Sequence, residues 1–262
     1  MDMLVEKKHT SHRVNSSRIK MDTYGNPGFS IDLKLQAQEL EILRKFIEVQ
    51  WLYRLQLLVP EHVYQFRKNG IERYHELSQL IDHAKAWPKY SRVLPAEAVN
   101  IIREMNFIKV LEEEFGKFMI ADEEKLGWEN IYWRLVRPGA TDYGTLHSDR
   151  WFVKLGYYGE EINNPSYERI KIWIAIYTQI EKNGLLVVPS SHHRTDWKWH
   201  AEEKYGLQKP VIDEDVAELK AILLPTESGR AVVFNYDLLH GGAPNHAEFT
   251  RVSAEFTFLV QR

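Results

Sequence analysis

The first half of the chain carries apolar side chains at three- and four-residue steps, which is the spacing of an amphipathic helix. The longest such stretch runs from Leu33 to about Leu58 and ends before Pro60. Pro88 and Pro95 punctuate the segments that follow, and we predict shorter helices at residues 61–66, 71–84, 96–105 and 108–115. The pattern therefore predicts a helical half that reaches to about residue 127.

After Gly127 the apolar period changes to two, which is the spacing of strands with one buried face. Turn residues such as Asn183-Gly184 and Gly241-Gly242 separate these segments. We predict strands at residues 130–136, 145–152, 171–180, 185–188, 219–224, 231–234, 237–241 and 251–260. Eight short strands after a helical half predict a mainly β fold, a double-stranded β-helix (jelly roll) of antiparallel sheets buttressed by α-helices.

The division of the chain follows from the same pattern. Residues 1–30 are polar and rich in basic side chains, so we expect a flexible N-terminal arm. Residues 31–262 are expected to form a single domain, in which residues 31–127 give helical support and residues 128–262 form the jelly-roll core. The long connections at residues 156–168 and 192–215 are expected to be lids or substrate loops.

The composition excludes several kinds of site and partner. The chain has no cysteine, which removes disulfides, thiolate zinc sites, iron–sulfur clusters and cysteine nucleophiles. A net charge of −3 without a long basic tract gives no reason to expect nucleic-acid binding. No apolar run has the length of a membrane span, and the first residues lack the apolar core of a signal peptide. We expect a soluble, cytoplasmic protein, of unknown oligomeric state.

The segment His147-Ser148-Asp149 is the first candidate for chemistry. Side chains alternate along an extended backbone, so His147 and Asp149 would point to the same side and could bind one cation. His240 ends a predicted strand 91 residues after Asp149. Two imidazoles and one carboxylate on one face of a metal, with the other face open, are the ligand set of non-haem Fe(II) oxygenases. Alone, the tripeptide also fits a packed histidine and a turn aspartate.

Arg251 lies 11 residues after His240, at the start of the last predicted strand, and Ser253 follows on the same face. An arginine can bind a carboxylate through two parallel hydrogen bonds, which a lysine cannot. Arg251, assisted by Ser253, is therefore the candidate that would bind the far carboxylate of a dicarboxylate co-substrate such as 2-oxoglutarate.

Together these residues resemble the Fe(II)/2-oxoglutarate-dependent dioxygenases, and most closely the phytanoyl-CoA dioxygenase-like (PhyH) family. The resemblance covers roughly residues 128–262. It includes the strand with Trp173, the segment from Asn183 to His192, and the His-Gly-Gly-x-Pro-Asn run that begins at His240. The family usually has glycine where this chain has Ser190, so a positive φ at that position would strain the turn.

The resemblance implies a dioxygenase that uses Fe(II), 2-oxoglutarate and O2 and releases succinate and CO2. The implied metal ligands are His147, Asp149 and His240. The implied co-substrate contacts are Arg251, Ser253, Trp173 and Ser148. Members of the family that halogenate have a small residue in place of the carboxylate ligand, so Asp149 favours hydroxylation.

We expect the substrate to be a small polar or anionic metabolite, such as a sugar acid, an amino acid or a biosynthetic intermediate. Basic and aromatic side chains just beyond the ligands and on the long loops suit an anionic molecule with a flat or apolar face. The candidate contacts are Arg150, Trp151, Trp197 and His200. The same residues could instead be solvated loop surface.

Two other classes of function remain open. A cupin-like jelly-roll protein could hold a metal or a sugar without catalysis, but Arg251 would then have no evident carboxylate to bind. A metal-dependent isomerase or hydrolase could use the same scaffold, but such sites usually carry more histidines or a general base beside the metal. Formation of succinate from 2-oxoglutarate would separate these classes.

Overall fold

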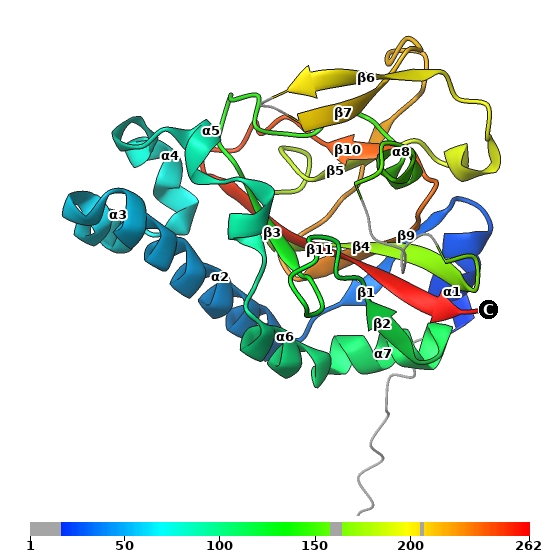
Figure 1. Cartoon of the computed structure of the whole chain (residues 1–262), viewed down its shortest axis with the longest axis horizontal. Coiled ribbons are helices and arrows are strands. Elements are labelled where there is room, and N and C mark those ends of the chain that lie inside the picture. Colours follow the sequence, from blue (N-terminus) through cyan, green and yellow to red (C-terminus); the bar gives the residue numbers. More distant parts are fainter. Residues whose placement is uncertain (1–16, 158–163, 205–206) are drawn as a thin grey trace, which may run out of the picture.

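A computed structural model describes residues 17–157, 164–204 and 207–262 of the chain (Figure 1). Most of its helices lie in the first half of the sequence. The α-helices are α1 (Ser17–Tyr24), α2 (Ala37–Leu58), α3 (Val63–Asn69), α4 (Tyr74–Leu77), α5 (His83–Ala86), α6 (Ala96–Arg103), α7 (Asn106–Phe115) and α8 (Asp149–Lys154). The 3-10 turns are η1 (Pro60–His62), η2 (Ile71–Arg73), η3 (Ser78–Leu80), η4 (Lys89–Arg92) and η5 (Ser191–His193).

The strands pair only with antiparallel neighbours in the described part of the chain. They are β1 (Phe29–Lys34), β2 (Phe118–Ile120), β3 (Tyr132–Val136), β4 (Tyr167–Tyr177), β5 (Leu185–Val187), β6 (Trp199–Lys204), β7 (Leu207–Ile212), β8 (Ile222–Leu223), β9 (Arg230–Asn235), β10 (His240–Gly242) and β11 (Arg251–Gln261). The main sheet has the order β1-β9-β4-β11-β2, with β3 also paired to β11. A second sheet has the order β10-β5-β8, and β6 and β7 form a separate hairpin.

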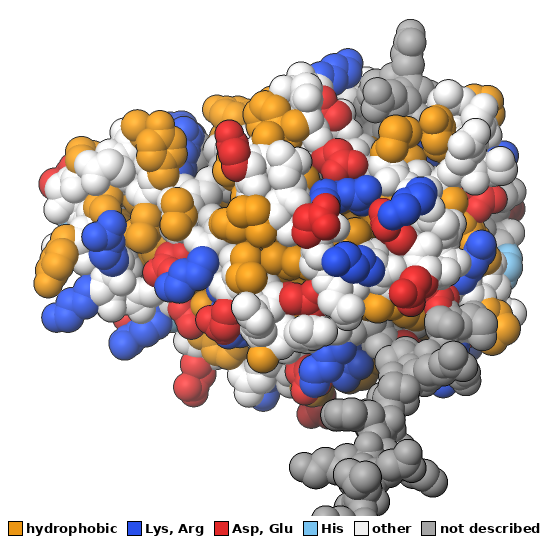
Figure 2. Space-filling model, turned by 90° about the horizontal axis from the view of Figure 1, so that it is seen from below, with side chains coloured by type: hydrophobic (Ala, Val, Ile, Leu, Met, Phe, Trp, Pro, Cys, Tyr) orange, Lys and Arg blue, Asp and Glu red, His pale blue; other side chains and the backbone are white. Residues whose placement is uncertain are grey.

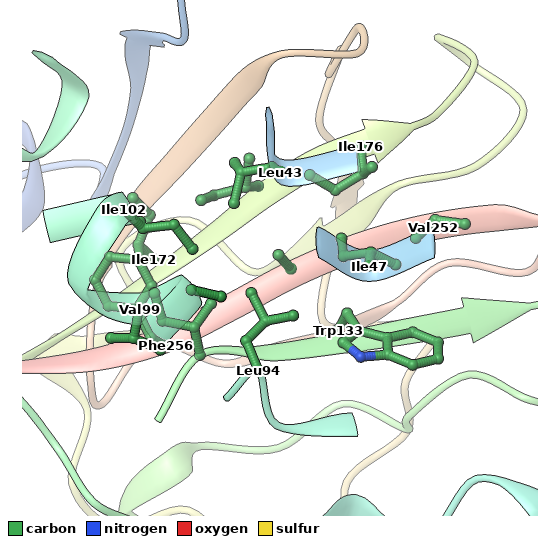
Figure 3. Packing of buried hydrophobic residues seen from close by; sticks show 14 of the residues in the cluster. Leu43, Ile47, Leu94, Val99, Ile102, Trp133, Ile172, Ile176, Val252 and Phe256 are labelled. Atoms are coloured by element: carbon green, nitrogen blue, oxygen red, sulfur yellow. The ribbon is translucent and has the colours of Figure 1, made fainter. Parts of the chain in front are cut away.

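The helices cover one face of the main sheet (Figure 1). Alternate residues of β4, such as Ile172 and Ile176, pack against Leu43 and Ile47 of α2, and Phe256 of β11 joins the same cluster (Figure 3). On α2 the buried positions recur every four residues, which turns one stripe of the helix toward the sheet. This arrangement matches the expected helical layer on one sheet of a jelly roll.

The other face of the main sheet is turned toward the second sheet. Trp173 of β4 and Phe234 of β9 belong to a buried cluster with Leu185 and Val187 of β5. Because strand side chains alternate, the polar residues of β4 and β11 that lie between the helix-facing positions point into this same space. The space between the sheets is therefore where polar side chains can meet a ligand.

The predicted strand at residues 145–152 is wrong, because α8 begins at Asp149. Ser148 is the last extended residue, with φ −102° and ψ 137°, and His147 pairs with His240 as an isolated β-bridge. A carboxylate in the first turn favours a helix start, since it lies near the partial positive charge of the free N–H groups. His147 and Asp149 therefore belong to an extended segment and a helix, respectively.

The N-terminal region differs from the expected arm. Residues 17–24 form α1, and β1 pairs with β9 at the edge of the main sheet. Residues 1–16 lie outside the described part of the chain. The helix predicted from Leu33 begins at Ala37, because Leu33 is buried as a strand residue of β1.

The structure describes the two long connections to different extents. Residues 192–215 contain the hairpin of β6 and β7, which the period of the sequence did not predict. Of residues 156–168, positions 158–163 lie outside the described residues. The predicted helix at 71–84 is divided into short turns, the predicted strand at 219–224 is reduced to β8, and the short strand β2 was not expected.

The surface mixes charge with apolar groups. On the face seen from below in Figure 2, acidic and basic side chains alternate with apolar ones. Val49, Tyr53 and Leu57 are exposed on α2 at four-residue steps, on the side away from its buried stripe. Among the described residues, no helix combines the length and the apolar character needed to cross a membrane.

We expect Trp51→Ala to lower the free energy of unfolding by about 3–5 kcal/mol. The Trp51 side chain is fully buried, and its ring packs edge-on against Phe66 and Tyr74 at centroid distances of 6.0 and 6.4 Å. Tyr53→Ala, on the exposed side of the same helix, should change stability by no more than about 0.5 kcal/mol. Urea unfolding of both variants checks this, and equal losses would contradict the assigned faces of α2.

Candidate metal centre and co-substrate site

Three side chains that the sequence singled out come together between the sheets. Each of three residues, His147, Asp149 and His240, has one ligand atom within 4.8 Å of a ligand atom of the other two. In the described part of the chain, these three residues form the group that could hold a metal ion. His147 and His240 exchange both of their backbone N–H···O bonds, each at 2.9 Å. The two imidazoles are therefore positioned by a backbone pairing.

The outward nitrogen of each histidine is free to bind a metal. Nδ1 of His147 lies 2.7 Å from the carbonyl oxygen of Thr145, and Nδ1 of His240 lies 3.0 Å from that of Leu238. A carbonyl can only accept, so Nδ1 carries the proton and Nε2 keeps its lone pair. Both Nε2 atoms face the carboxylate of Asp149, at 3.9 Å for His147 and 3.6 Å for His240.

These distances are too long for hydrogen bonds, so the three groups converge on a point without satisfying one another. Oδ2 of Asp149 is buried and has no hydrogen-bond partner among the described residues. Burial, and then the neighbouring His240, lower the pKa of His147 to about 4, so this imidazole is neutral at neutral pH. Neutral imidazoles and an ionised carboxylate are what a divalent iron requires, and the residues fit that ion.

Aromatic rings enclose the centre. Phe152 of α8 stands edge-on to the His147 ring at 5.2 Å, and Phe234 of β9 lies 4.6 Å from the His240 ring. These rings keep water from part of the site and hold the imidazoles in place.

Arg251 provides a second, separate anion-binding feature. Its side chain is 1% exposed, and Nη1 donates to the carbonyl oxygens of Gly184 at 2.6 Å and Ala243 at 3.1 Å. Nε is buried and has no partner among the described residues. Burial, together with the charge of Arg134, lowers the pKa of Arg251 to about 9. A buried guanidinium with an unused donor fits the far carboxylate of 2-oxoglutarate.

The two glycines after His240 allow this packing. A Cβ on Gly241 would lie 3.0 Å from the backbone of Thr145, and a Cβ on Gly242 would lie 3.1 Å from Nη2 of Arg251. Any side chain there would separate the His147 segment from β10 or displace the guanidinium. The Gly-Gly pair is thus part of the site, although it binds nothing itself.

The other residues implied by the resemblance have varied positions. Ser253 is buried on β11, opposite Ala175 and on the same face as Arg251. Trp173 is buried in the cluster between the sheets. Ser148 is also buried, but its hydroxyl donates to the carbonyl oxygen of Tyr236 at 3.4 Å. Ser190 has φ 63°, the left-handed conformation that the family's glycine adopts more easily.

Each residue expected to contact the substrate already has a partner within the chain. Arg150 binds the carboxylate of Asp237 through Nε and Nη2. Trp151 stacks on Trp199 at 5.4 Å with an interplanar angle of 9°. Trp197 donates to the carbonyl oxygen of Ser191 and lies under the Arg194 guanidinium, and His200 contacts Asp213 at 2.5 Å. Each of these four side chains therefore makes an intramolecular contact, and their contact with a substrate stays a prediction.

Sequence reasoning missed two polar residues that face the space between the sheets. Lys171 of β4 and Tyr236, which follows β9, are 5% and 2% exposed. The alternation of β4 was the available signal, since it places Lys171 on the same face as Trp173. Nothing in the local sequence pattern pointed to Tyr236.

Comparisons with known proteins identify a family for the chain. The model of the family "Phytanoyl-CoA dioxygenase (PhyH)" matches residues 74–253, which is more than half of the chain. The match begins in the helical half, upstream of the segment in which the resemblance was visible. None of the curated proteins compared with the chain matches it in sequence.

Solved structures show the same fold at low sequence identity. EvdO2 from Micromonospora carbonacea var. aurantiaca, complexed with 2-oxoglutarate, is 16% identical with a TM-score of 0.56, over 99% of this chain and 94% of that one. AviO1 from Streptomyces viridochromogenes Tue57 is 13% identical with a TM-score of 0.52, over 91% and 92%. SnoK, a non-heme alpha ketoglutarate dependent carbocyclase from nogalamycin biosynthesis, is 14% identical with a TM-score of 0.53, over 92% and 83%.

The likeness to these structures confirms the predicted jelly-roll class, and the family match confirms the expected cofactors, Fe(II) and 2-oxoglutarate. By this match the chain belongs to the phytanoyl-CoA dioxygenase (PhyH) family, and it is an Fe(II)- and 2-oxoglutarate-dependent oxygenase.

Proposed function

We propose that this oxygenase hydroxylates an unactivated C–H bond of a small polar or anionic metabolite. The observation that carries the proposal is the convergence of His147, Asp149 and His240 within 4.8 Å, beside a buried arginine with an unused donor. In this proposal the three residues hold Fe(II), Arg251 binds the far carboxylate of 2-oxoglutarate, and Ser253 adds a hydroxyl on the same face of β11.

When bound together, Fe(II), 2-oxoglutarate and O2 supply the oxidant for the C–H bond, and 2-oxoglutarate leaves as succinate and CO2. The chain's own residues fix positions and proton states. The carbonyl oxygens of Thr145 and Leu238 keep the protons on the Nδ1 atoms, so both Nε2 atoms stay available to the metal. Phe152 and Phe234 exclude water from the two imidazoles.

Two features support hydroxylation of a small molecule. Asp149 supplies a carboxylate at the position where halogenating members carry a small residue, so no place is left for chloride among the ligands. The second feature concerns the substrate class: the metal-binding side chains lie between two sheets, and SnoK, which shares this fold, is named as a carbocyclase from nogalamycin biosynthesis. We therefore propose a small metabolite as the substrate class.

His240→Ala should abolish iron binding and succinate formation while leaving the secondary structure intact, because the imidazole contributes a ligand and its backbone pairing remains. Iron content and the visible charge-transfer band of anaerobic Fe(II) with 2-oxoglutarate provide the measurement. His246→Ala, which removes an exposed histidine six residues later, is the matched control and should behave like the wild type. Full iron occupancy in His240→Ala would refute the ligand assignment.

Arg251→Lys should weaken 2-oxoglutarate binding by roughly 1–3 kcal/mol, about tenfold to a hundredfold, because lysine keeps the charge but loses the planar fork. Iron affinity should stay nearly constant. Titration of the charge-transfer band with 2-oxoglutarate measures the first quantity, and iron content measures the second. Arg230→Lys, a change at a half-buried arginine that pairs with Glu227, serves as the control. Equal losses for metal and co-substrate would assign Arg251 a different role.

A metabolite screen scored by substrate-stimulated succinate release should identify sugar acids, amino acids or other small anions as activators. Neutral lipids and acyl-CoA thioesters should give no stimulation, since a buried charged site would leave its ions unpaired beside an apolar chain. Stimulation by the lipids alone would show that the proposed substrate class is wrong.

A further inference from the structure

We propose that Lys171 and Tyr236 together bind an anionic group of the substrate, a carboxylate or a phosphate-type oxyanion. This inference rests on the proposed function, since it assumes that a substrate enters the space between the sheets. It assigns the anion to Lys171 of β4 and to Tyr236, which follows β9, and not to the four residues of α8 and the 192–215 connection that the sequence suggested.

Lys171 lies close to the metal-binding residues. Its neighbours Ile170 and Ile172 pack on the helical side of β4, so Lys171 points to the other side, as Trp173 does. In the sheet it lies opposite Phe234 of β9 and Thr257 of β11. Because the Phe234 ring contacts His240 at 4.6 Å, Lys171 is one strand away from a residue that touches the centre.

The ammonium of Lys171 is poorly satisfied where it lies. Its side chain is buried, yet its contacts are long, 3.4 Å to Oγ1 of Thr257 and 3.6 Å to Oε1 of Glu123. Glu123 also binds Lys89 at 3.0 Å and accepts the Thr257 hydroxyl at 2.5 Å, so its oxygens are shared among three groups. An ammonium has three donors, so Lys171 retains the capacity to bind a further acceptor.

Tyr236 has a buried hydroxyl with no partner among the described residues. The pairing of Ile170 with Asn235, continued by one residue, brings Tyr236 beside Arg169, whose guanidinium carbon lies 6.0 Å from the tyrosine ring. The hydrogen bond from Ser148 to the carbonyl oxygen of Tyr236 places the same residue next to α8, where Asp149 begins the helix. The backbone of Tyr236 therefore lies next to the residue that precedes α8, and its ring lies next to Arg169 of β4.

The charges around both groups keep them as donors. Burial, and then the carboxylates of Asp149 and Glu123, raise the pKa of Tyr236, so its hydroxyl stays protonated. Burial opposes the charge of Lys171, but Glu123 and then Asp149 outweigh it and raise the pKa of this lysine. An ammonium and a hydroxyl that both donate are complementary to the oxygens of an oxyanion.

This subsite is distinct from the one proposed for 2-oxoglutarate. Arg251 and Thr257, the residue opposite Lys171, are six residues apart on β11, which is about 20 Å of strand at about 3.3 Å per residue. The co-substrate would therefore occupy the Arg251 end of the space, and the substrate anion the Lys171 end.

The test uses the full chain with Fe(II) and saturating 2-oxoglutarate, without O2. Under these conditions 2-oxoglutarate occupies the position at Arg251, so that a further anion must bind elsewhere. Benzoate, phenylphosphonate and the uncharged benzamide are titrated while the charge-transfer band is recorded. We expect the preferred anion to bind at least tenfold more tightly than benzamide, and the comparison of the two anions shows which oxyanion fits. Tyr236→Phe should lose at least tenfold in anion affinity, and Lys171→Met should remove the preference over benzamide.

Melting temperature distinguishes a binding role from a structural one. Since the Tyr236 hydroxyl has no partner, Tyr236→Phe should melt at the same temperature as the wild type or higher. Tyr74→Phe is the matched control: its hydroxyl contacts Nδ1 of His83 and accepts from Trp87, each at 3.0 Å, so its loss should lower the melting temperature and leave anion binding unchanged.

Equal binding of benzoate, phenylphosphonate and benzamide would overturn the inference. So would an unchanged anion affinity in Tyr236→Phe, or a lowered melting temperature for that variant. These outcomes are separate from failure of the proposed function, in which neutral lipids alone, and no small anion, would stimulate succinate release by the wild-type chain.

Discussion

The alternation of side chains along β4 and β11 is the constraint on which the other features depend. The two strands pair from Val252 with Tyr177 to Gln261 with Tyr167, so one face of each is set against the helices and the other against the second sheet. The helix-facing residues are almost all Ile, Val, Ala and Phe. The opposite face holds the arginine, the serine and the lysine that give the space between the sheets its chemistry. Sliding either strand by one residue would exchange the two faces and place the charges among the helices.

Burying so many charges on one face requires that they be paired closely. Arg134 donates to Glu255 at 3.0 Å, and Lys89 binds Glu123 at the same distance. Burial alone would raise the pKa of Glu123, but the ammonium groups of Lys171 and Lys89 lower it to about 2. The interior thus contains ionised groups, and among the described residues the Arg251 guanidinium keeps a buried Nε without a hydrogen-bond partner. A buried polar group without a partner is costly, which is one basis for our proposal that the substrate is anionic.

The sequence alone was sufficient to identify the candidate metal ligands, because they belong to short motifs. His147, Asp149 and His240 were identified from spacing, and the apolar period predicted most strands of the jelly roll. The geometry that brings the first two together was misjudged, because a six-residue helix cannot be distinguished from a strand by periodicity alone. The sequence pattern did not predict that Lys171 and Tyr236 lie near the site, for a different reason. Their proximity depends on the register of β4 against β9, which is set by contacts between residues 57 to 65 positions apart. Strand β1 was missed because its alternation is short and merges into the helical pattern of α2.

The backbone pairing of His147 with His240 has a consequence for which substitutions the centre tolerates. Its two hydrogen bonds of 2.9 Å join main-chain atoms, so they do not depend on the identity of either side chain. A Cβ at Gly241 would lie 3.0 Å from the backbone of Thr145, so the distance between the two segments does depend on this glycine. A change in either histidine therefore alters the chemistry of the centre, whereas a change at Gly241 alters the spacing of the segments that carry both histidines.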